Sequence, residues 1–247
     1  MPALLILKEP DLGTAMIFLP VAFVMMFAAG VPMRHLLILA GLVVAIAAIL
    51  LGLLFLPQKM GASEETAEGI LRTVGLKGYH RDRIVGFIKP GKDPLGTGWN
   101  KMQSQIAIGS GGPWGKGFLK GTQNILGFLP RSVAPTDFIY SVIAEEMGFF
   151  GSVLVLLLFG LLLFCGMQTA LAAQDKLGHL LCTGVVVMIF CHVFINIAMT
   201  AGLLPITGLP LPLLRYGGSF MIVTMSALGI VQSVYIRSRR VDLFEVV

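Results

Sequence analysis

The chain has 247 residues, of which 56% are hydrophobic and only 13% are charged, and its formal net charge is +5. The mean hydropathy of +0.87 and the scarcity of charge exclude a soluble domain, which carries about 25% charged residues. The three cysteines have no CxxC spacing, so they indicate neither a disulfide framework nor a zinc site.

Five apolar runs follow one another along the chain, and each has the roughly 20 residues that a spanning helix needs. They cover residues 12–33, 36–56, 149–173, 177–214 and 216–236. They predict an all-α fold, a polytopic bundle of about five transmembrane helices. The first residues, MPALLILKEPDLG, lack the basic start of a signal peptide and are typical of the end of another span. We therefore expect the chain to begin inside a larger protein.

Basic residues beside the spans predict how the bundle lies in the membrane. Short loops that carry Lys or Arg stay in the cytoplasm, and such loops hold Arg34, Lys176, Arg237, Arg239 and Arg240. The other connections then lie outside. The expected organisation is two spans in 1–56, a large extracytoplasmic loop in 57–136, and three spans with a short cytoplasmic tail in 137–247.

Residues 57–136 form a basic loop with eleven Lys or Arg and five acids. This positive surplus suits an anionic lipid headgroup or a pyrophosphate; non-specific attraction to anionic lipid explains it equally well. After Ser63, apolar residues recur at helical spacing, at Ala67, Ile70, Leu71 and Val74. This pattern predicts a short amphipathic helix that lies on the membrane.

Glycines and lysines gather in QSQIAIGSGGPWGKGFLKGTQ, residues 103–123. Glycines let backbone N–H groups converge on an anion, which Lys116 and Lys120 would neutralise. The stretch is not a P-loop, because Ser110 stands where the first glycine is required and Gly117 follows Lys116. It fails the dinucleotide fingerprint as well. The alternative, which the isolated motif favours, is a glycine-rich loop folded tightly over the bundle.

Three acids precede or enter the third span. Asp137 lies in APTDF, a good helix start, where helix capping is the alternative role for a carboxylate. Glu145 and Glu146 lie roughly 12 and 13 Å further along the same helix axis. Charges at such depth usually face a cavity or a partner. We therefore expect a polar cavity that opens to the outside at Asp137.

Other polar groups are candidates for the same cavity. His192, Asn196 and Thr200 form a stripe on the fourth span, for which hydrogen bonding between helices is the alternative. Asp11 is a further candidate, with helix capping as its alternative. After the fourth span, residues 203–218 combine prolines and glycines up to Arg215, which predicts a re-entrant turn at the edge of the cavity.

Four motifs in order, KEPDLGTA, the glycine-rich stretch 103–123, FLPRSVAPTDFIYSVIAEEMG and GLLPITGLPLPLLRYGGS, resemble the SEDS family of bacterial cell-wall proteins, the RodA/FtsW group, and more closely its RodA branch. The resemblance implies a ten-span fold of which this chain is the second half. It also implies a place in the bacterial cytoplasmic membrane, with the large loop outside and the C-terminus inside.

The activity implied by the resemblance is a peptidoglycan glycosyltransferase of the elongation type. Such an enzyme polymerises lipid II, releases undecaprenyl pyrophosphate, and works beside a class B penicillin-binding protein; no nucleic-acid partner is expected. Asp137 matches the essential acid of the family's TDF motif, and is expected to act as a base or to hold a divalent cation, Mg²⁺ or Mn²⁺. Substrate contacts are expected from Gln103, Ser110, Lys116, Lys120, Arg131, Glu145, Glu146 and Arg215, the last of which stands where the family usually has Ser.

Two other functions stay open on the sequence. A lipid II transporter also requires a polar cavity, broken helices and intramembrane acids. A non-catalytic scaffold for a penicillin-binding protein requires only the surface of the bundle. An acid at an outward-facing mouth favours the glycosyltransferase over the transporter, because transport predicts polar groups near the midplane.

Overall fold

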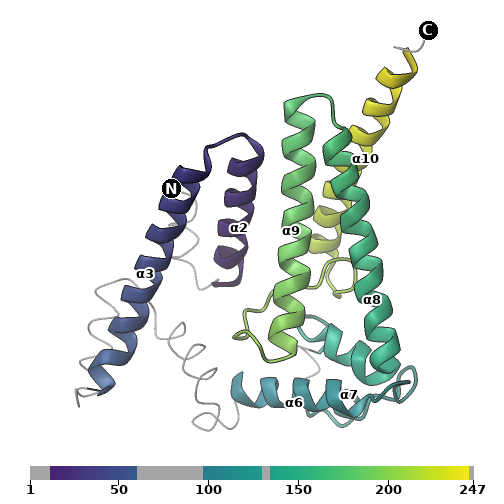
Figure 1. The fold of residues 1–247 in the computed structure, drawn as a ribbon. Helices are drawn as coiled ribbons and strands as arrows, with labels where there is room; N and C mark the ends of the chain where they lie inside the picture. Colours follow the sequence, from purple (N-terminus) through teal and green to yellow (C-terminus); the bar gives the residue numbers. More distant parts are fainter. Residues whose placement is uncertain (1–11, 60–96, 130–133, 245–247) are drawn as a thin grey trace.

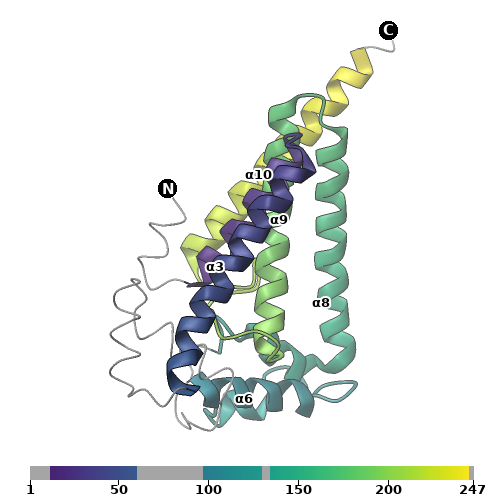
Figure 2. The ribbon, with the colours of Figure 1, turned by 60° about the vertical axis from the view of Figure 1, so that its left-hand side comes forward.

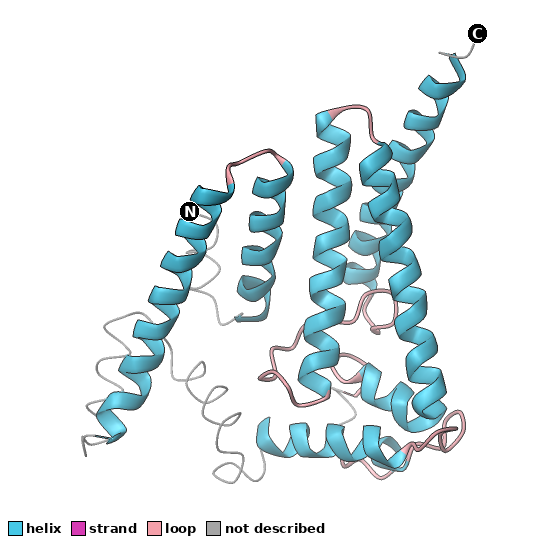
Figure 3. Cartoon of the chain, in the orientation of Figure 1, coloured by secondary structure: helices cyan, strands magenta, loops and turns pink. Residues whose placement is uncertain are grey.

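The computed structural model describes residues 12–59, 97–129 and 134–244, and every regular element within these residues is a helix (Figures 1 and 3). The all-α prediction is therefore confirmed, in keeping with apolar segments that satisfy their backbone groups internally. The predictions for Asp11, Arg131 and the amphipathic helix that starts near Ser63 fall outside the described residues.

The first two helices form a pair at one edge of the bundle. α2 (Leu12–Ala28) and α3 (Met33–Lys59) match the first two predicted spans and are joined by a short turn. Ile17 of α2 packs with Cys191 and Ile195 of α9 (Lys176–Thr200), whereas α3 lies outside α2 (Figure 1). α2 thus attaches this pair to the rest of the molecule.

Three further helices form the centre of the bundle. The apolar stretches Ile139–Ala172, Lys176–Thr200 and Gly218–Ser238 of α8 (Ile139–Ala172), α9 and α10 (Gly218–Phe244) are long and apolar enough to cross a membrane. Phe159, Ile189, Val193 and Leu211 fill the space between them. Their outer faces carry exposed apolar residues such as Leu157 and Leu161, because lipid, not water, surrounds them. The chain is an integral membrane protein.

α8 consists of two segments that meet at Gly148. The φ of 67° and ψ of −161° at this residue interrupt the helix, and such a backbone is open essentially to glycine alone. Residues 139–147 run across the base of the bundle in Figure 1, and the long apolar segment begins at Phe149. Glu145 and Glu146 were expected inside the span. The break at Gly148 comes after them, so both lie on the segment that runs across the base of the bundle.

A layer of short helices closes this end. α6 (Thr97–Ser110) and α7 (Thr122–Ile125) lie across the ends of α8 and α9 (Figure 1). Ser104 of α6 donates its hydroxyl hydrogen to Thr200 O at 2.7 Å, and its Oγ is 2.6 Å from Ser141 Oγ. Because Ser104 and Ser141 are fully buried, these contacts fix α6 to both long helices.

Residues 201–217 connect α9 to α10 without regular helix. They return into the bundle, where Leu211 and Pro212 are fully buried. The turned view in Figure 2 shows this connection on the same side as α6, whereas the α8–α9 turn and the end of α10 lie at the opposite end. The turn between α2 and α3 lies at the same end as the α8–α9 turn (Figure 1). This agrees with the grouping of Arg34, Lys176 and Arg237 that the charge pattern predicts.

Candidate active site

Asp137 lies in the turn that leads into α8. Its neighbour Phe138 is fully buried against Ala107, Leu129 and Ala134, which anchors the turn. The side chain of Asp137 remains 18% exposed. Phe138, and not Asp137, occupies the N-cap position of α8, so a role as the cap does not account for the carboxylate.

Asn196 of α9 holds the backbone of Asp137. Its side chain is fully buried, and Nδ2 donates to Asp137 O at 2.9 Å and to Leu209 O at 2.7 Å. The other two residues of the predicted stripe bond within α9, His192 to Met188 O and Thr200 to Ile197 O. Hydrogen bonding between segments therefore explains Asn196, and this bonding ties the start of α8 to the connection 201–217.

The connection 201–217 brings a cation to Asp137. Arg215 Nη2 lies 3.8 Å from Asp137 Oδ1, and the Arg215 side chain is 30% exposed. Tyr216 N donates to Pro135 O at 3.1 Å, so the connection is also bonded to the chain just before Asp137. A carboxylate and a guanidinium thus lie side by side, and both reach the surface of the described structure.

One buried polar atom next to this pair and one within it lack hydrogen-bond partners in the described structure. Asn196 Oδ1 and Arg215 Nε are buried and have no hydrogen-bond partner within the described residues. Buried polar atoms are nearly always bonded, and an orphaned one calls for an explanation such as water or a ligand. The surroundings of Asp137 therefore have the chemistry of a site that receives a polar group.

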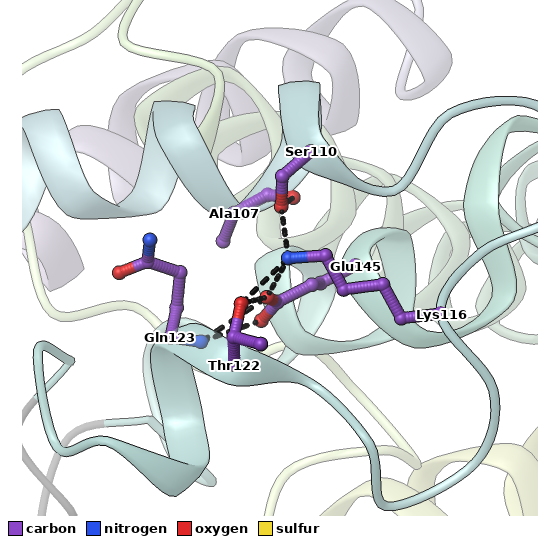
Figure 4. Close-up of polar contacts among 6 residues, drawn as sticks. All are labelled: Ala107, Ser110, Lys116, Thr122, Gln123 and Glu145. Atoms are coloured by element: carbon purple, nitrogen blue, oxygen red, sulfur yellow. Dashed lines mark hydrogen bonds and ion pairs between the residues drawn. The ribbon is translucent and has the colours of Figure 1, made fainter.

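Lys116 and Glu145 form a second cluster (Figure 4). Lys116 Nζ lies 2.6 Å from Glu145 Oε1, 2.6 Å from Thr122 Oγ1 and 2.8 Å from Ser110 Oγ. An ammonium group has three donors, so all three are engaged. Thr122 Oγ1 donates to Glu145 Oε1 at 2.8 Å, and Gln123 N donates to the same atom at 3.1 Å. The carboxylate of Glu145 is fully buried, and this network supplies its hydrogen bonds.

The glycine-rich loop is bonded along its backbone to the two glutamates. Lys116 N donates to Glu145 O at 3.0 Å, Gly117 N donates to Glu146 O at 2.9 Å, and Leu119 N donates to Glu146 Oε2 at 3.0 Å. Gly115 has a φ of 80° and a Cβ there would collide with Glu146 O. The loop is therefore folded tightly over the bundle, and the anion that it surrounds is the protein's own carboxylate.

The predicted site residues thus separate into two groups. Arg215 and Asn196 contact Asp137. Lys116 contacts Glu145, and Ser110 accepts a hydrogen bond from Lys116. Gln103 is buried on α6, and the side chain of Lys120 is exposed. Thr122 and Gln123 were not predicted as partners of Glu145. No spacing signal marks them, because they lie more than twenty residues away in the chain.

The surroundings of Asp137 lack the ligands that a divalent cation needs in the described part of the chain. Mg²⁺ prefers octahedral coordination by oxygen atoms, often carboxylates and water. No group of three or more His, Cys, Asp or Glu side chains gathers in the described part of the chain, and the charge next to Asp137 is the guanidinium of Arg215. These residues do not form a metal-binding set.

Comparisons with known proteins identify similar chains. Residues 1–240 match the family model for FtsW, RodA and SpoVE, described as cell cycle proteins. The peptidoglycan glycosyltransferase MrdB of Escherichia coli K12 is 40% identical over 235 residues, which are 95% of this chain and 57% of MrdB. RodA of Treponema pallidum is 36% identical over 290 residues, covering 96% of this chain and 66% of that protein.

A solved structure has the same fold. The chain superposes on it with a TM-score of 0.68 and 35% sequence identity, covering 94% of this chain and 57% of the other. That structure is described as the structural coordination of polymerization and crosslinking by a peptidoglycan synthase complex. This chain therefore spans little more than half the length of the relatives that it matches.

Proposed function

The chain belongs to the FtsW/RodA/SpoVE family, the SEDS family expected from its motifs, and from this premise we propose that it is a peptidoglycan glycosyltransferase that polymerises lipid II during cell elongation. The names of similar proteins support this activity. The observation that carries the proposal is the partly exposed carboxylate of Asp137 beside the guanidinium of Arg215.

Asp137 acts as the general base in this proposal. The sugar 4-hydroxyl of one substrate attacks the anomeric carbon of another, and its proton passes to the carboxylate. A glycosidic C–O bond forms while the bond from the anomeric carbon to the diphosphate oxygen breaks, and its electron pair leaves with undecaprenyl pyrophosphate. A positioned base contributes about 10²- to 10⁴-fold to the rate of such a step.

Arg215 stabilises the leaving diphosphate in this proposal. A guanidinium offers planar pairs of donors that match phosphate oxygens, and it stabilises charge that develops as the bond breaks. Lys116 was expected in this role, but its three donors are engaged by Ser110, Thr122 and Glu145. Arg215 is therefore the better candidate of the two.

The proposed setting is the bacterial cytoplasmic membrane, with residues 57–136 outside, the C-terminus inside, and a class B penicillin-binding protein as partner. The distribution of basic residues supports the orientation. The similar solved structure, a complex for polymerization and crosslinking, supports the partner. The transporter alternative loses one argument, because Glu145 and Glu146 precede the break at Gly148 and are bonded to the glycine-rich loop.

The test uses a chimera in which this chain replaces the matching part of E. coli MrdB, so that the remainder of the relative is present. The purified chimera is incubated with lipid II and a class B penicillin-binding protein, and the products are separated on a gel. Glycan chains are expected. Movement of lipid II across liposomes without glycan chains would support transport instead, and neither activity in a folded chimera would favour a scaffold.

A further inference from the structure

The hairpin of residues 111–121 exposes large apolar side chains. Trp114, Phe118 and Leu119 are 78%, 79% and 68% exposed. The hairpin projects sideways at the base of α8 in Figure 1. It has no acidic residue and carries two lysines. Exposed apolar groups gathered in this way mark a contact with a partner or a membrane.

The position of the hairpin is fixed by its backbone. Phe149 N donates to Gly112 O at 2.8 Å and Phe150 N donates to Pro113 O at 3.2 Å. Leu119 has a φ of 58°, a conformation that is costly for a residue with a Cβ, and its N–H is held by Glu146. The apolar side chains are therefore displayed by a tied loop.

The exposed apolar side chains of the hairpin continue the apolar outer face of α8. The ring of Trp114 lies 4.7 Å from that of Phe150, between centroids. From Phe150, exposed apolar residues recur along α8 at helical spacing, at Leu154, Leu157 and Leu161. This stripe faces lipid in a membrane helix, and Trp114 lies at the end of it.

We propose that the hairpin 111–121 is an interfacial membrane anchor, which inserts Trp114, Phe118 and Leu119 between the headgroups and the acyl chains of the bilayer at the base of α8. Tryptophan is enriched at this depth because its ring is apolar and its N–H is polar. Exposed Lys120 extends its charged end to the lipid phosphates.

The anchor has a consequence for the site. The hairpin is bonded to the backbone of Glu145 and Glu146, which belong to the segment 139–147 that follows Asp137 directly. The depth of the hairpin in the bilayer therefore sets the height of Asp137 above the membrane surface. An enzyme that acts on a lipid-linked sugar requires this height to be constant.

Fluorescence tests the proposal, because the chain has only two tryptophans, Trp99 and Trp114. The whole chain with Trp99→Phe is reconstituted in vesicles of phosphatidylethanolamine and phosphatidylglycerol that contain lipids brominated at defined positions. We expect the Trp114 emission to be quenched several-fold more by bromine near the headgroup than by bromine near the bilayer centre. Acrylamide in the water should quench it weakly. The chain can insert into the vesicle membrane in either direction. Both directions place the hairpin at the surface of a leaflet, so the quenching result does not depend on the orientation of the chain.

The matched control carries Trp114→Phe and reports Trp99, whose Nε1 donates to Phe128 O at 3.1 Å. If Trp99→Phe does not fold, the difference in emission between the unchanged chain and Trp114→Phe gives the same signal. Strong acrylamide quenching of Trp114 without quenching by brominated lipid would overturn the proposal. Protection of Trp114 only after a penicillin-binding protein is added would also overturn it, in favour of a protein contact. No substrate is present, so the outcome is independent of the proposed glycosyltransferase activity.

Discussion

Asp137 is positioned by hydrogen bonds to the main chain around it. Asn196 binds Asp137 O and Leu209 O, and Tyr216 N binds Pro135 O. The carboxylate itself is left beside Arg215. This arrangement fixes the backbone around Asp137 and places its carboxylate next to the guanidinium of Arg215.

Replacing Asn196 should loosen this arrangement. In Asn196→Leu two buried carbonyl oxygens lose their donor, at a cost of about 1–3 kcal/mol each. The free energy of unfolding in detergent should fall accordingly, and the polymerisation rate in the chimera should fall with it. Thr183→Val serves as the control, because Thr183 is a buried residue of α9 that bonds only to His179 O in its own helix. An equal loss of stability in both variants would contradict the assigned role of Asn196.

Lys116 and Glu145 should stabilise the end layer as a pair. Breaking a buried ion pair by removing one partner costs about 3–5 kcal/mol, and Lys116→Met should lie at the lower end because Lys116 is 26% exposed. Glu145→Gln should lower stability by a similar amount. The double variant should lose less than the sum of the two single variants. Unfolding measurements on the four proteins give the coupling, and strict additivity would contradict the pairing.

At the scale of residues, motifs in the sequence single out Asp137, Glu145 and Lys116 as functional candidates. Their partners could not be predicted, because the contact between Lys116 and Glu145 depends on how the hairpin 111–121 folds back over residues 139–147. Asn196 had two interpretations, since a polar stripe on a helix has the same spacing whether it lines a cavity or bonds to a neighbour.

At the scale of elements, α8 shows how a single glycine divides a helix by function. The segment before Gly148 carries the acids and joins the end layer, and the segment after it crosses the membrane. The charge-free run begins at Phe149, directly after the break. The break itself could not be predicted, since a glycine in an apolar run is equally compatible with continuous helix and the positive φ depends on contacts with the hairpin.

Gly148→Ala should therefore destabilise the protein strongly. The backbone conformation costs a residue with a Cβ about 1–3 kcal/mol, and a Cβ there would also collide with Gly115 N. Gly160→Ala, in the same helix, has no neighbouring atom within 4 Å of the added Cβ and should change stability by less than about 1 kcal/mol. The melting temperatures of the two variants in detergent test this. Similar melting temperatures would show that residue 148 does not need a glycine.

At the scale of the whole molecule, hydropathy and charge predict five apolar helices and the grouping of their connections, because both depend on the membrane as solvent. They do not predict the layer formed by α6, α7, the hairpin and residues 139–147, which depends on hydrogen bonds between distant segments. Asp137 lies beside this layer, where the connection 201–217 returns into the bundle. The site thus lies where the lipid-embedded helices meet this hydrogen-bonded layer.

The most direct measurement of the central claim compares Asp137→Asn with Asp175→Asn in the MrdB chimera supplied with lipid II. Asp175 lies at the opposite end of the bundle, where it accepts a hydrogen bond from Gly178 N that asparagine can also accept. We predict that Asp137→Asn loses about 10²- to 10⁴-fold in polymerisation rate while its melting temperature is unchanged. Asp175→Asn should keep normal activity. Glycan chains made by Asp137→Asn at the rate of the unchanged chimera would contradict the account.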